Sequence, residues 1–514
     1  MRAEKSIKNA IISLISQFLI CISGFAMRYV FIKVLNSEYL GLSNLFANVL
    51  TVLSLAELGV GSAITFSLYK PISENDTKQI IALMQLFKRF YIFVGMFVLS
   101  AGLLLAPFLP FIVKEMPKNV EHIYIIFIMY VVNSGISYFY SYKATFLNAV
   151  QEYYIYSLNH SICYVFMILI QIGVLIITKN FLIYYAIQII MTLVENIAIS
   201  YIAGKKYPIL KSKDRVNVYD DTMKNIKINV LAMIGHNIGN IVLNSTDNII
   251  ISKFVGVVEV GLYSNYLMIT SAINSFLLQI FVSVNSSIGN MLIEGSDEQK
   301  DNTFYVIFFV DFWIYTVASI AIFVLSTPSI ELFFGNEYKL EESIVAVIAI
   351  NFYSTGMRQT CISFKNANGL FLQDVHKAYI EATLNLIVSI FLVKKIGIIG
   401  VLLGTLISTY SIAIWIEPYV LFKYGFKKSV FPYFKRFITY LISFLTIGVI
   451  TRETVNMVKT CGIVGLMLKG FIVLIVSSLF IIILNCRTKE FKLLFDTLLR
   501  IIRNKQEGNK SERK

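Results

Sequence analysis

Apolar runs long enough to cross a lipid bilayer recur along the whole of this 514-residue chain. A transmembrane helix needs about 20 mainly apolar residues, and its backbone must satisfy its own hydrogen bonds because lipid offers none. Hydrophobic residues make up 57% of the chain and charged residues 15%, whereas about a quarter of the residues in a soluble domain are charged. The sequence therefore predicts an all-α polytopic membrane protein.

Runs of suitable length fit about fourteen transmembrane helices. We place them near residues 9–32, 40–67, 90–113, 122–147, 153–178, 181–203, 229–252, 261–290, 303–327, 343–367, 374–394, 397–422, 437–451 and 464–485. About 33 of the Lys and Arg residues then lie on one side and about 12 on the other, as the positive-inside rule describes. Both termini are therefore expected in the cytoplasm, and the net charge of +14 does not indicate nucleic-acid binding.

Polar residues recur at a nearly constant separation, which indicates an internal repeat. Three pairs are 219 positions apart: Gln17 and His236, Cys21 and Asn240, and Arg28 and Asp247. Other pairs are 218 or 220 positions apart: Asn133 and Asn351, Lys205 and Lys423, and Gly41 and Gly261. The first twelve helices thus form two six-helix halves. Because six is even, the halves are parallel repeats, and a cavity is expected between them near the membrane midplane.

A strongly basic loop between the sixth and seventh helices separates the two halves. We predict an N-terminal lobe over residues 1–215, a C-terminal lobe over 216–425, and two further helices within 426–486. The last segment, 487–514, has a helical pattern with apolar residues on one face and basic residues on the other. It is therefore expected to lie along the cytoplasmic membrane surface.

Polar residues inside the predicted spans mark the candidate site, because a polar face is costly in lipid and turns toward protein or water. One helix face carries a stripe spaced four, four and three residues apart: His236, Asn240, Asn244 and Asp247. The full set expected to line a substrate-binding cavity is Arg28, His236, Asn240, Asn244, Asp247, Arg358, Gln17 and Asn351. Glu57 is interpreted as either a coupling acid or a structural one.

Several of these residues also have a structural interpretation. Arg28 either contacts an anion or pairs with a carboxylate such as Glu57. Asp247 lines the cavity, caps an outer helix end, or pairs with Lys253. His236 either titrates near neutral pH or is a hydrogen-bonded structural histidine. Four further acids in or near the spans either bind a coupling cation or form structural pairs: Glu195, Asp311, Glu381 and Glu417.

Missing motifs exclude several classes of chemistry. The chain contains no GxxxxGK[ST] phosphate loop and no GxSxG or HExxH run, and no hydrophilic segment is long enough for a soluble catalytic domain. Its four His and five Cys show neither metal-ligand spacing nor a CxxC pair. An enzyme that uses intramembrane residues stays possible, although no motif marks one. We expect no metal site and no cofactor except a coupling cation, H⁺ or Na⁺.

Several runs, in their order and spacing, resemble bacterial Wzx-type oligosaccharide flippases. They are AELGVGSA (56–63), HNIG (236–239), STDNIIISK (245–253), GLYSN (261–265), FKNANGLF (364–371) and GIIGVLLGTLIS (397–408). These flippases belong to the multidrug/oligosaccharidyl-lipid/polysaccharide (MOP) exporter superfamily, together with the MATE transporters. The resemblance covers nearly the whole chain and implies a V-shaped pair of six-helix lobes plus two added helices. Related lipid II flippases carry a cavity cation in the first helix, and Arg28 fits that position.

The resemblance also implies a substrate and a direction of transport. An undecaprenyl-diphosphate-linked oligosaccharide repeat unit would move from the cytoplasmic to the outer leaflet of the bacterial cytoplasmic membrane by alternating access. The expected partners are this lipid, the membrane lipids and polysaccharide polymerase machinery, and a monomer is expected. O-antigen, capsule and other surface polysaccharide routes stay open. The alternatives are a cation-coupled multidrug exporter of the same superfamily and a membrane polysaccharide polymerase or ligase.

Overall fold

The computed structural model describes residues 2–57, 60–117, 119–212, 214, 216–224, 226, 230, 245–294, 296–370, 373–460 and 462–496. Within these ranges every regular element is a helix. Most of the predicted helix 229–252, with His236, Asn240 and Asn244, lies outside the described residues, and so does the predicted tail beyond residue 496.

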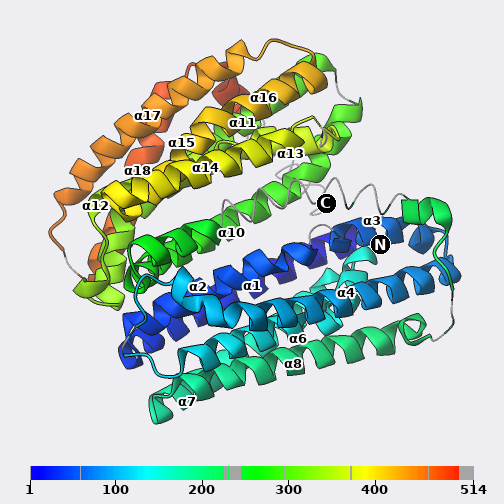
Figure 1. Cartoon of the computed structure of the whole chain (residues 1–514). Helices are drawn as coiled ribbons and strands as arrows, with labels where there is room; N and C mark the ends of the chain where they lie inside the picture. Colours follow the sequence, from blue (N-terminus) through cyan, green and yellow to red (C-terminus); the bar gives the residue numbers. More distant parts are fainter. Residues whose placement is uncertain are drawn as a thin grey trace, which may run out of the picture. The chain divides into compact units, whose positions relative to one another are not determined.

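The chain divides into two compact units (Figure 1). The amino unit contains Met1–Met268 and Val375–Gly404, and the carboxyl unit contains Ile269–Asp374 and Thr405–Lys514. The lobe boundaries expected at residues 215 and 425 stay a prediction.

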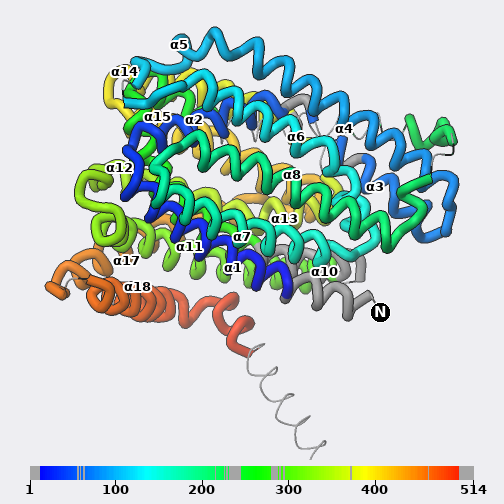
Figure 2. The backbone as a smooth tube through the Cα atoms, turned by 90° about the horizontal axis from the view of Figure 1, so that it is seen from below, coloured from blue at the N-terminus to red at the C-terminus, as the bar shows by residue number. Residues whose placement is uncertain are grey.

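The amino unit is a bundle of long helices joined by short turns (Figures 1 and 2). In chain order they are α1 (Arg2–Val34), α2 (Ser37–Leu53), α3 (Val60–Ser73), α4 (Thr77–Leu105), α5 (Leu109–Ile112), α6 (Ile123–Ala149), α7 (Tyr153–Thr178) and α8 (Phe181–Lys206). Short 3₁₀ turns lie at Ser54–Glu57, Ala106–Phe108 and Pro208–Lys211. The unit also holds helical residues 245–254, the start of α10 (Val257–Glu294), α14 (Val375–Ile396) and the start of α15 (Ile398–Ser408).

The carboxyl unit takes the rest of α10 and α15 and adds further helices. These are α11 (Asp297–Phe333), α12 (Glu342–Gly356), α13 (Gln359–Ala367), α16 (Ile414–Val420), α17 (Phe431–Asn456) and α18 (Gly462–Asn485). A 3₁₀ turn lies at Asn336–Tyr338. Two π-helical turns, Thr409–Ala413 and Leu421–Phe426, flank α16.

The predicted all-α membrane fold is confirmed. Among the described residues, nine helices are long and apolar enough to cross a membrane, and the predicted spans 122–147, 153–178 and 181–203 correspond to α6, α7 and α8. Two predicted helices are each divided: 40–67 into α2 and α3, and 343–367 into α12 and α13. Hydropathy did not show these breaks, because each of them is only a few residues long and an average over about 20 residues hides a short polar stretch.

The helix predicted at 437–451 is longer in the structure, where α17 covers Phe431–Asn456. Its added ends carry charged residues that pair outside the apolar window. Arg436 bonds to Glu490 at 2.7 Å, and Arg452 lies 2.5 Å from Glu342. Hydropathy therefore located the membrane-spanning part of this helix and missed its polar ends.

Polar residues at helix starts explain where several long helices begin. The side chains of Asn36, Asp76 and Asn180 accept hydrogen bonds from backbone N–H groups in the first turns of α2, α4 and α8. Ser296 and Gln299 form a reciprocal capping box at the start of α11. These side chains satisfy backbone donors that have no partner within the helix.

Small residues let α4 and α6 pack closely in the amino unit. A Cβ atom added to Gly95 on α4 would lie 3.0 Å from the carbonyl oxygen of Gly135 on α6. A Cβ added to Gly102 would lie 2.6 Å from Val131. Such contacts are typical of membrane helices, where dispersion between closely packed backbones stabilises the bundle.

The carboxyl unit packs around a row of aromatic rings on α11. Phe304, Phe308 and Phe312 are fully buried and meet Tyr433 and Tyr440 of α17. The rings of Phe312 and Tyr440 stack with centroids 4.2 Å apart. Offset stacking of this kind adds about 0.5–1.5 kcal/mol to the burial of each ring pair.

The described start of the predicted tail, residues 489–496, is helical and packs on the carboxyl unit. Glu490 is buried and bonds to Arg436, and the ring of Phe491 meets Phe309 at a centroid distance of 6.1 Å. Phe495, one turn later, is exposed. The placement of the tail on the membrane surface stays a prediction.

Gly41 and Gly261, which the repeat makes equivalent, lie against each other within the amino unit. A Cβ added to Gly41 would lie 1.9 Å from the carbonyl oxygen of Val257, and one added to Gly261 would lie 2.7 Å from that of Ser37. Any larger residue at either position must push the start of α2 away from the start of α10.

We predict that Gly41→Ala lowers the thermal stability of the purified protein in detergent, by about 1–3 kcal/mol as in other overpacked sites. The matched control is Gly173→Ala in α7, where an added Cβ meets nothing within 4 Å. That control is expected to be neutral or slightly stabilising, because Ala favours the helix. Equal melting temperatures for the two variants would contradict the close contact.

Candidate functional site

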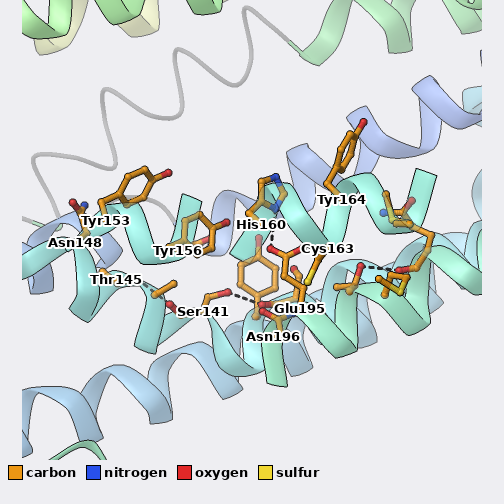
Figure 3. A pocket seen from close by; sticks show the side chains of 18 residues that line it. Ser141, Thr145, Asn148, Tyr153, Tyr156, His160, Cys163, Tyr164, Glu195 and Asn196 are labelled. Atoms are coloured by element: carbon orange, nitrogen blue, oxygen red, sulfur yellow. Dashed lines mark hydrogen bonds and ion pairs between the residues drawn. The ribbon is translucent and has the colours of Figure 1, made fainter. Parts of the chain in front are cut away.

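A cavity of about 600 Å³ lies in the amino unit, between α6, α7 and α8 (Figure 3). Its lining is mainly polar or aromatic. Hydroxyl groups come from Ser137, Ser141, Thr145 and Thr192, amides from Asn148, Gln188 and Asn196, and phenol rings from Tyr138, Tyr153, Tyr156 and Tyr164. Its ionisable lining residues are Glu57, His160, Cys163 and Glu195.

Hydrogen bonds and stacking hold several cavity side chains in place. Glu195 Oε1 lies 2.8 Å from His160 Nδ1, and this pair joins α8 to α7 (Figure 3). The ring of Tyr156 stacks nearly parallel on that of His160, with centroids 5.9 Å apart and an interplanar angle of 7°. Gln171 donates to the side-chain oxygen of Gln188 at 3.2 Å. The cavity thus presents ordered donors, acceptors and aromatic faces.

Glu57 reaches the cavity from the break between α2 and α3. Its Oε1 accepts a hydrogen bond from the hydroxyl of Tyr91 on α4 at 2.5 Å. The helical path is interrupted here, with Ser54–Glu57 in a 3₁₀ turn and α3 beginning at Val60. A carboxylate at a broken helix inside the bundle is a recurrent position for an ion site in transporters.

The cavity lining has no Lys or Arg among the residues that the structure describes. Arg28 of α1 lies beside it. A Cβ added to Gly24, one helical turn before Arg28, would lie 3.3 Å from the hydroxyl of the cavity residue Tyr164. The charge of Arg28 lies within electrostatic range of Tyr184, Tyr130 and Tyr164.

Arg28 is half-buried and donates from Nη1 to the hydroxyl of Ser264 at 3.3 Å. No ion pair joins Arg28 to Glu57, although the structure describes both side chains. Gln17 lies on the same α1 face, where its amide contacts Cys21 Sγ at 3.5 Å. The Arg28–Glu57 pairing offered by the sequence is therefore not formed in this structure.

Asp247 is buried, within the helical residues 245–254. Its charge acts on the hydroxyl of Tyr263, at the start of α10. No ion pair joins it to Lys253, and the structure describes both residues. The other members of its predicted stripe, His236, Asn240 and Asn244, lie outside the described residues, so the stripe stays a prediction.

Arg358 and Asn351 belong to the carboxyl unit. Arg358 lies between α12 and α13 and donates to Glu417 from Nε at 2.9 Å and from Nη2 at 2.6 Å. Both residues are largely buried, with side chains 15% and 1% exposed. Asn351 is half-buried one turn before the end of α12. Glu417 therefore forms a structural ion pair with Arg358 in this conformation. This is one of the two roles that the sequence left open for it.

A second acid supports the same break between α12 and α13. Asp311 of α11 is fully buried and accepts hydrogen bonds from the backbone N–H of Thr360, at 2.9 Å, and from its hydroxyl. Thr360 lies in the first turn of α13, where backbone N–H groups lack helical partners. Asp311 therefore acts as a cap supplied by a neighbouring helix.

Next to the cavity residue Tyr153, a small cluster joins the start of α7 to the end of α8. Glu152 lies 2.6 Å from Lys206 Nζ and accepts a hydrogen bond from the Tyr207 hydroxyl at 2.8 Å. Burial, followed by the hydrogen bond to Glu152, raises the pKa of Tyr207 above its ordinary value. A phenol is already protonated at neutral pH, and the raised pKa keeps it a donor to Glu152 at more alkaline pH as well.

Sequence reasoning missed most of the residues that line the cavity. Of the residues singled out from the sequence, Glu57 and Glu195 line it and Arg28 lies beside it. A signal was present, because Ser137, Ser141, Thr145 and Asn148 on α6 have the same four, four, three spacing as the stripe at 236–247. Hydroxyl and amide side chains carry no charge, so the stripe on α6 did not stand out among apolar residues.

No protein-family model matches this chain, and no curated protein matches it. Solved membrane transporters share its fold. The lipid II flippase MurJ in an inward closed conformation is 16% identical, with 92% of this chain and 98% of that chain covered and a TM-score of 0.64. An inward-facing multidrug resistance MATE family transporter of the MOP superfamily is 15% identical, with 80% and 98% covered and a TM-score of 0.60.

A third solved structure, a mutant of the Vibrio cholerae MATE transporter VcmN, is 13% identical, with 83% of this chain and 99% of that chain covered and a TM-score of 0.59. At these identities the likeness establishes the fold. The chain is thus a multi-pass membrane protein with a fold found in a lipid flippase and in MATE transporters.

We predict that Glu417→Ala destabilises the protein by about 3–5 kcal/mol, because it leaves the Arg358 charge buried without its partner. The measurement is thermal unfolding in detergent. The double variant Arg358→Met/Glu417→Leu should recover most of the loss, since it removes both charges. The control is Glu342→Ala, which breaks an exposed pair with Arg452 and should cost at most about 1 kcal/mol. If Glu417→Ala and Glu342→Ala lower the stability by similar amounts, the Arg358–Glu417 pair does not act as a buried structural pair.

Proposed function

We propose that this protein flips an undecaprenyl-diphosphate-linked oligosaccharide from the cytoplasmic to the outer leaflet of the bacterial cytoplasmic membrane. The observation that supports this most is a polar, tyrosine-lined cavity within a fold shared with a lipid II flippase. The same assignment places both termini in the cytoplasm and the protein in the synthesis of a cell-surface polysaccharide, as the sequence resemblance implies.

The cavity chemistry suits sugars. An oligosaccharide carries many hydroxyl groups, and transferring them into hydrocarbon without hydrogen bonds costs several kcal/mol for each group. The hydroxyl and amide side chains on α6 and α8 supply replacement partners. Tyr153, Tyr156 and Tyr164 on α7 add flat apolar faces, against which the C–H face of a sugar ring can pack.

The diphosphate needs a different environment from the sugars. The carboxylates of Glu57 and Glu195 line the cavity and would repel a phosphate placed between them. Arg28, beside Tyr164, offers a cation near the cavity and has a neutral hydrogen-bond partner in Ser264. We therefore place the diphosphate near Arg28, with the lipid tail left in the bilayer and the sugars in the cavity.

A coupling cation, H⁺ or Na⁺, is part of this proposal. Glu57 and Glu195 are the acids that line the cavity. Glu57 accepts from a neutral tyrosine, and Glu195 is next to a histidine, so neither has a Lys or Arg partner among the described contacts. These two carboxylates are our candidates for binding the cation during alternating access.

A cation-coupled drug exporter is the second candidate, and the same two carboxylates favour it, because acids in an aromatic cavity also suit a cationic drug. The two functions predict different phenotypes. Loss of a drug exporter changes drug tolerance and leaves surface polysaccharide intact, whereas loss of the flippase removes the polysaccharide.

The direct test is to delete the gene and extract lipid-linked sugars from the cells. We expect surface polysaccharide to disappear and complete repeat units to accumulate on their lipid, facing the cytoplasm. Intact polysaccharide with altered drug tolerance would favour the exporter. Outward-facing but unpolymerised units would instead indicate a polymerase.

We predict that Arg28→Ala abolishes export, because a charge-assisted hydrogen bond to phosphate contributes about 1.5–3 kcal/mol, which corresponds to roughly a tenfold to hundredfold loss of affinity. Export is measured by complementing the deletion strain, with membrane abundance measured in parallel. The matched control is Ser264→Ala, which removes the hydrogen-bond partner of Arg28 and keeps the charge. Normal export by Arg28→Ala at normal abundance would overturn this role.

A further inference from the structure

A second cavity, of about 550 Å³, lies in the amino unit between α4, α6 and the 3₁₀ turn that follows α8. We call it the basic pocket, because four cationic side chains line it: Lys88, Arg89, Lys143 and Lys211. Among the described residues, its lining contains no acid. Its remaining lining is formed by apolar and neutral polar side chains of the same elements.

The four cations form no salt bridges within the part of the chain that the structure describes. Lys143 Nζ donates to the hydroxyl of Ser200 at 2.5 Å, and this is a neutral partner. None of the four forms a salt bridge with a described residue. The nearby Asp214 accepts a hydrogen bond from the hydroxyl of Ser212, and its backbone oxygen accepts one from Gln85. Like charges gathered in one pocket repel one another, so an anionic ligand would stabilise the arrangement.

The pocket borders a face of α4 that suits lipid chains. Lys88 and Arg89 are exposed, and the next two turns of α4 present Ile92, Phe93, Met96 and Phe97, which are 40%, 65%, 53% and 44% exposed. These residues belong to the membrane-spanning segment Thr77–Ile112. Along α4, cationic side chains are therefore followed directly by apolar ones. This order matches a lipid that has an anionic headgroup and apolar chains.

The pocket is separate from the cavity proposed to take sugars. Helix α6 supplies Ser141 and Thr145 to that cavity and Tyr142 and Lys143 to the basic pocket. Successive helical residues differ in direction by about 100°, so the two pockets lie on different faces of α6. A ligand in the basic pocket therefore does not occupy the proposed transport site.

We propose that the basic pocket binds the phosphate of an anionic phospholipid headgroup, with the acyl chains lying along α4. Each Lys or Arg near the membrane surface contributes about 1 kcal/mol to the binding of anionic lipids. Arg and Lys are also the side chains that usually contact phosphate groups. The bound headgroup also neutralises the charges on Lys143 of α6 and Lys211 of the turn. It thereby fastens the segment after α8 to α4 and α6.

The experiment uses the full-length protein purified in detergent and titrated with phosphatidylglycerol, with bound lipid counted by native mass spectrometry. We expect saturable binding of phosphatidylglycerol, and binding about tenfold to thirtyfold weaker in K88Q/K211Q. The matched control is K78Q/K205Q, which removes two exposed lysines outside the pocket and should bind lipid like the unmodified protein. K88R/K211R keeps both charges and should also retain binding.

A second arm distinguishes a lipid from a soluble anion. Inorganic phosphate is titrated as a competitor, and we expect weak competition because it lacks the acyl chains that contact α4. Phosphate binding as tight as that of the lipid would overturn the lipid assignment. If K88Q/K211Q and K78Q/K205Q lose phosphatidylglycerol binding equally, or if neither loses it, the basic pocket is not the binding site and the proposal is overturned. Unchanged melting temperatures for the lipid-free variants show that the losses are not due to unfolding.

Discussion

Polar groups inside a membrane-spanning bundle must find their partners within the protein or in enclosed water, because hydrocarbon offers none. The structure meets this constraint at a few places. Side chains of α6, α7 and α8 turn their hydroxyl and amide groups into one cavity, and His160 bonds to Glu195 there. In the carboxyl unit, Arg358 is held by Glu417. Elsewhere, α4, α7 and α18 present large apolar side chains outward, as lipid requires.

Breaks in two helices coincide with charged side chains. Glu57 lies at the interruption between α2 and α3, and Arg358 lies between α12 and α13, where Asp311 caps the new helix start. A break leaves backbone donors and acceptors without helical partners, and nearby polar side chains supply them. At the start of α13 the acceptor is Asp311, whereas Glu57 accepts from the hydroxyl of Tyr91.

Charge is distributed unevenly between the two pockets of the amino unit. The cavity that suits sugars contains carboxylates, whereas the basic pocket on another face of α6 contains four cations. The two pockets therefore favour ligands of different charge. We propose a neutral sugar chain for the first pocket and an anionic headgroup for the second. Arg28 lies on α1 one turn after Gly24, which approaches the cavity residue Tyr164, and Arg28 is not among the residues that line the cavity with the acids.

Sequence alone determined the positions of most membrane helices, since hydropathy over about 20 residues follows directly from bilayer thickness. The repeat that it predicts stays a prediction, although its two glycines, Gly41 and Gly261, meet in the structure. Only the tertiary structure showed that Glu417, 59 residues from Arg358, is its partner, and that α6, α7 and α8 enclose a cavity. Such contacts depend on how distant helices pack, and a local pattern of polarity contains no information about which faces will meet.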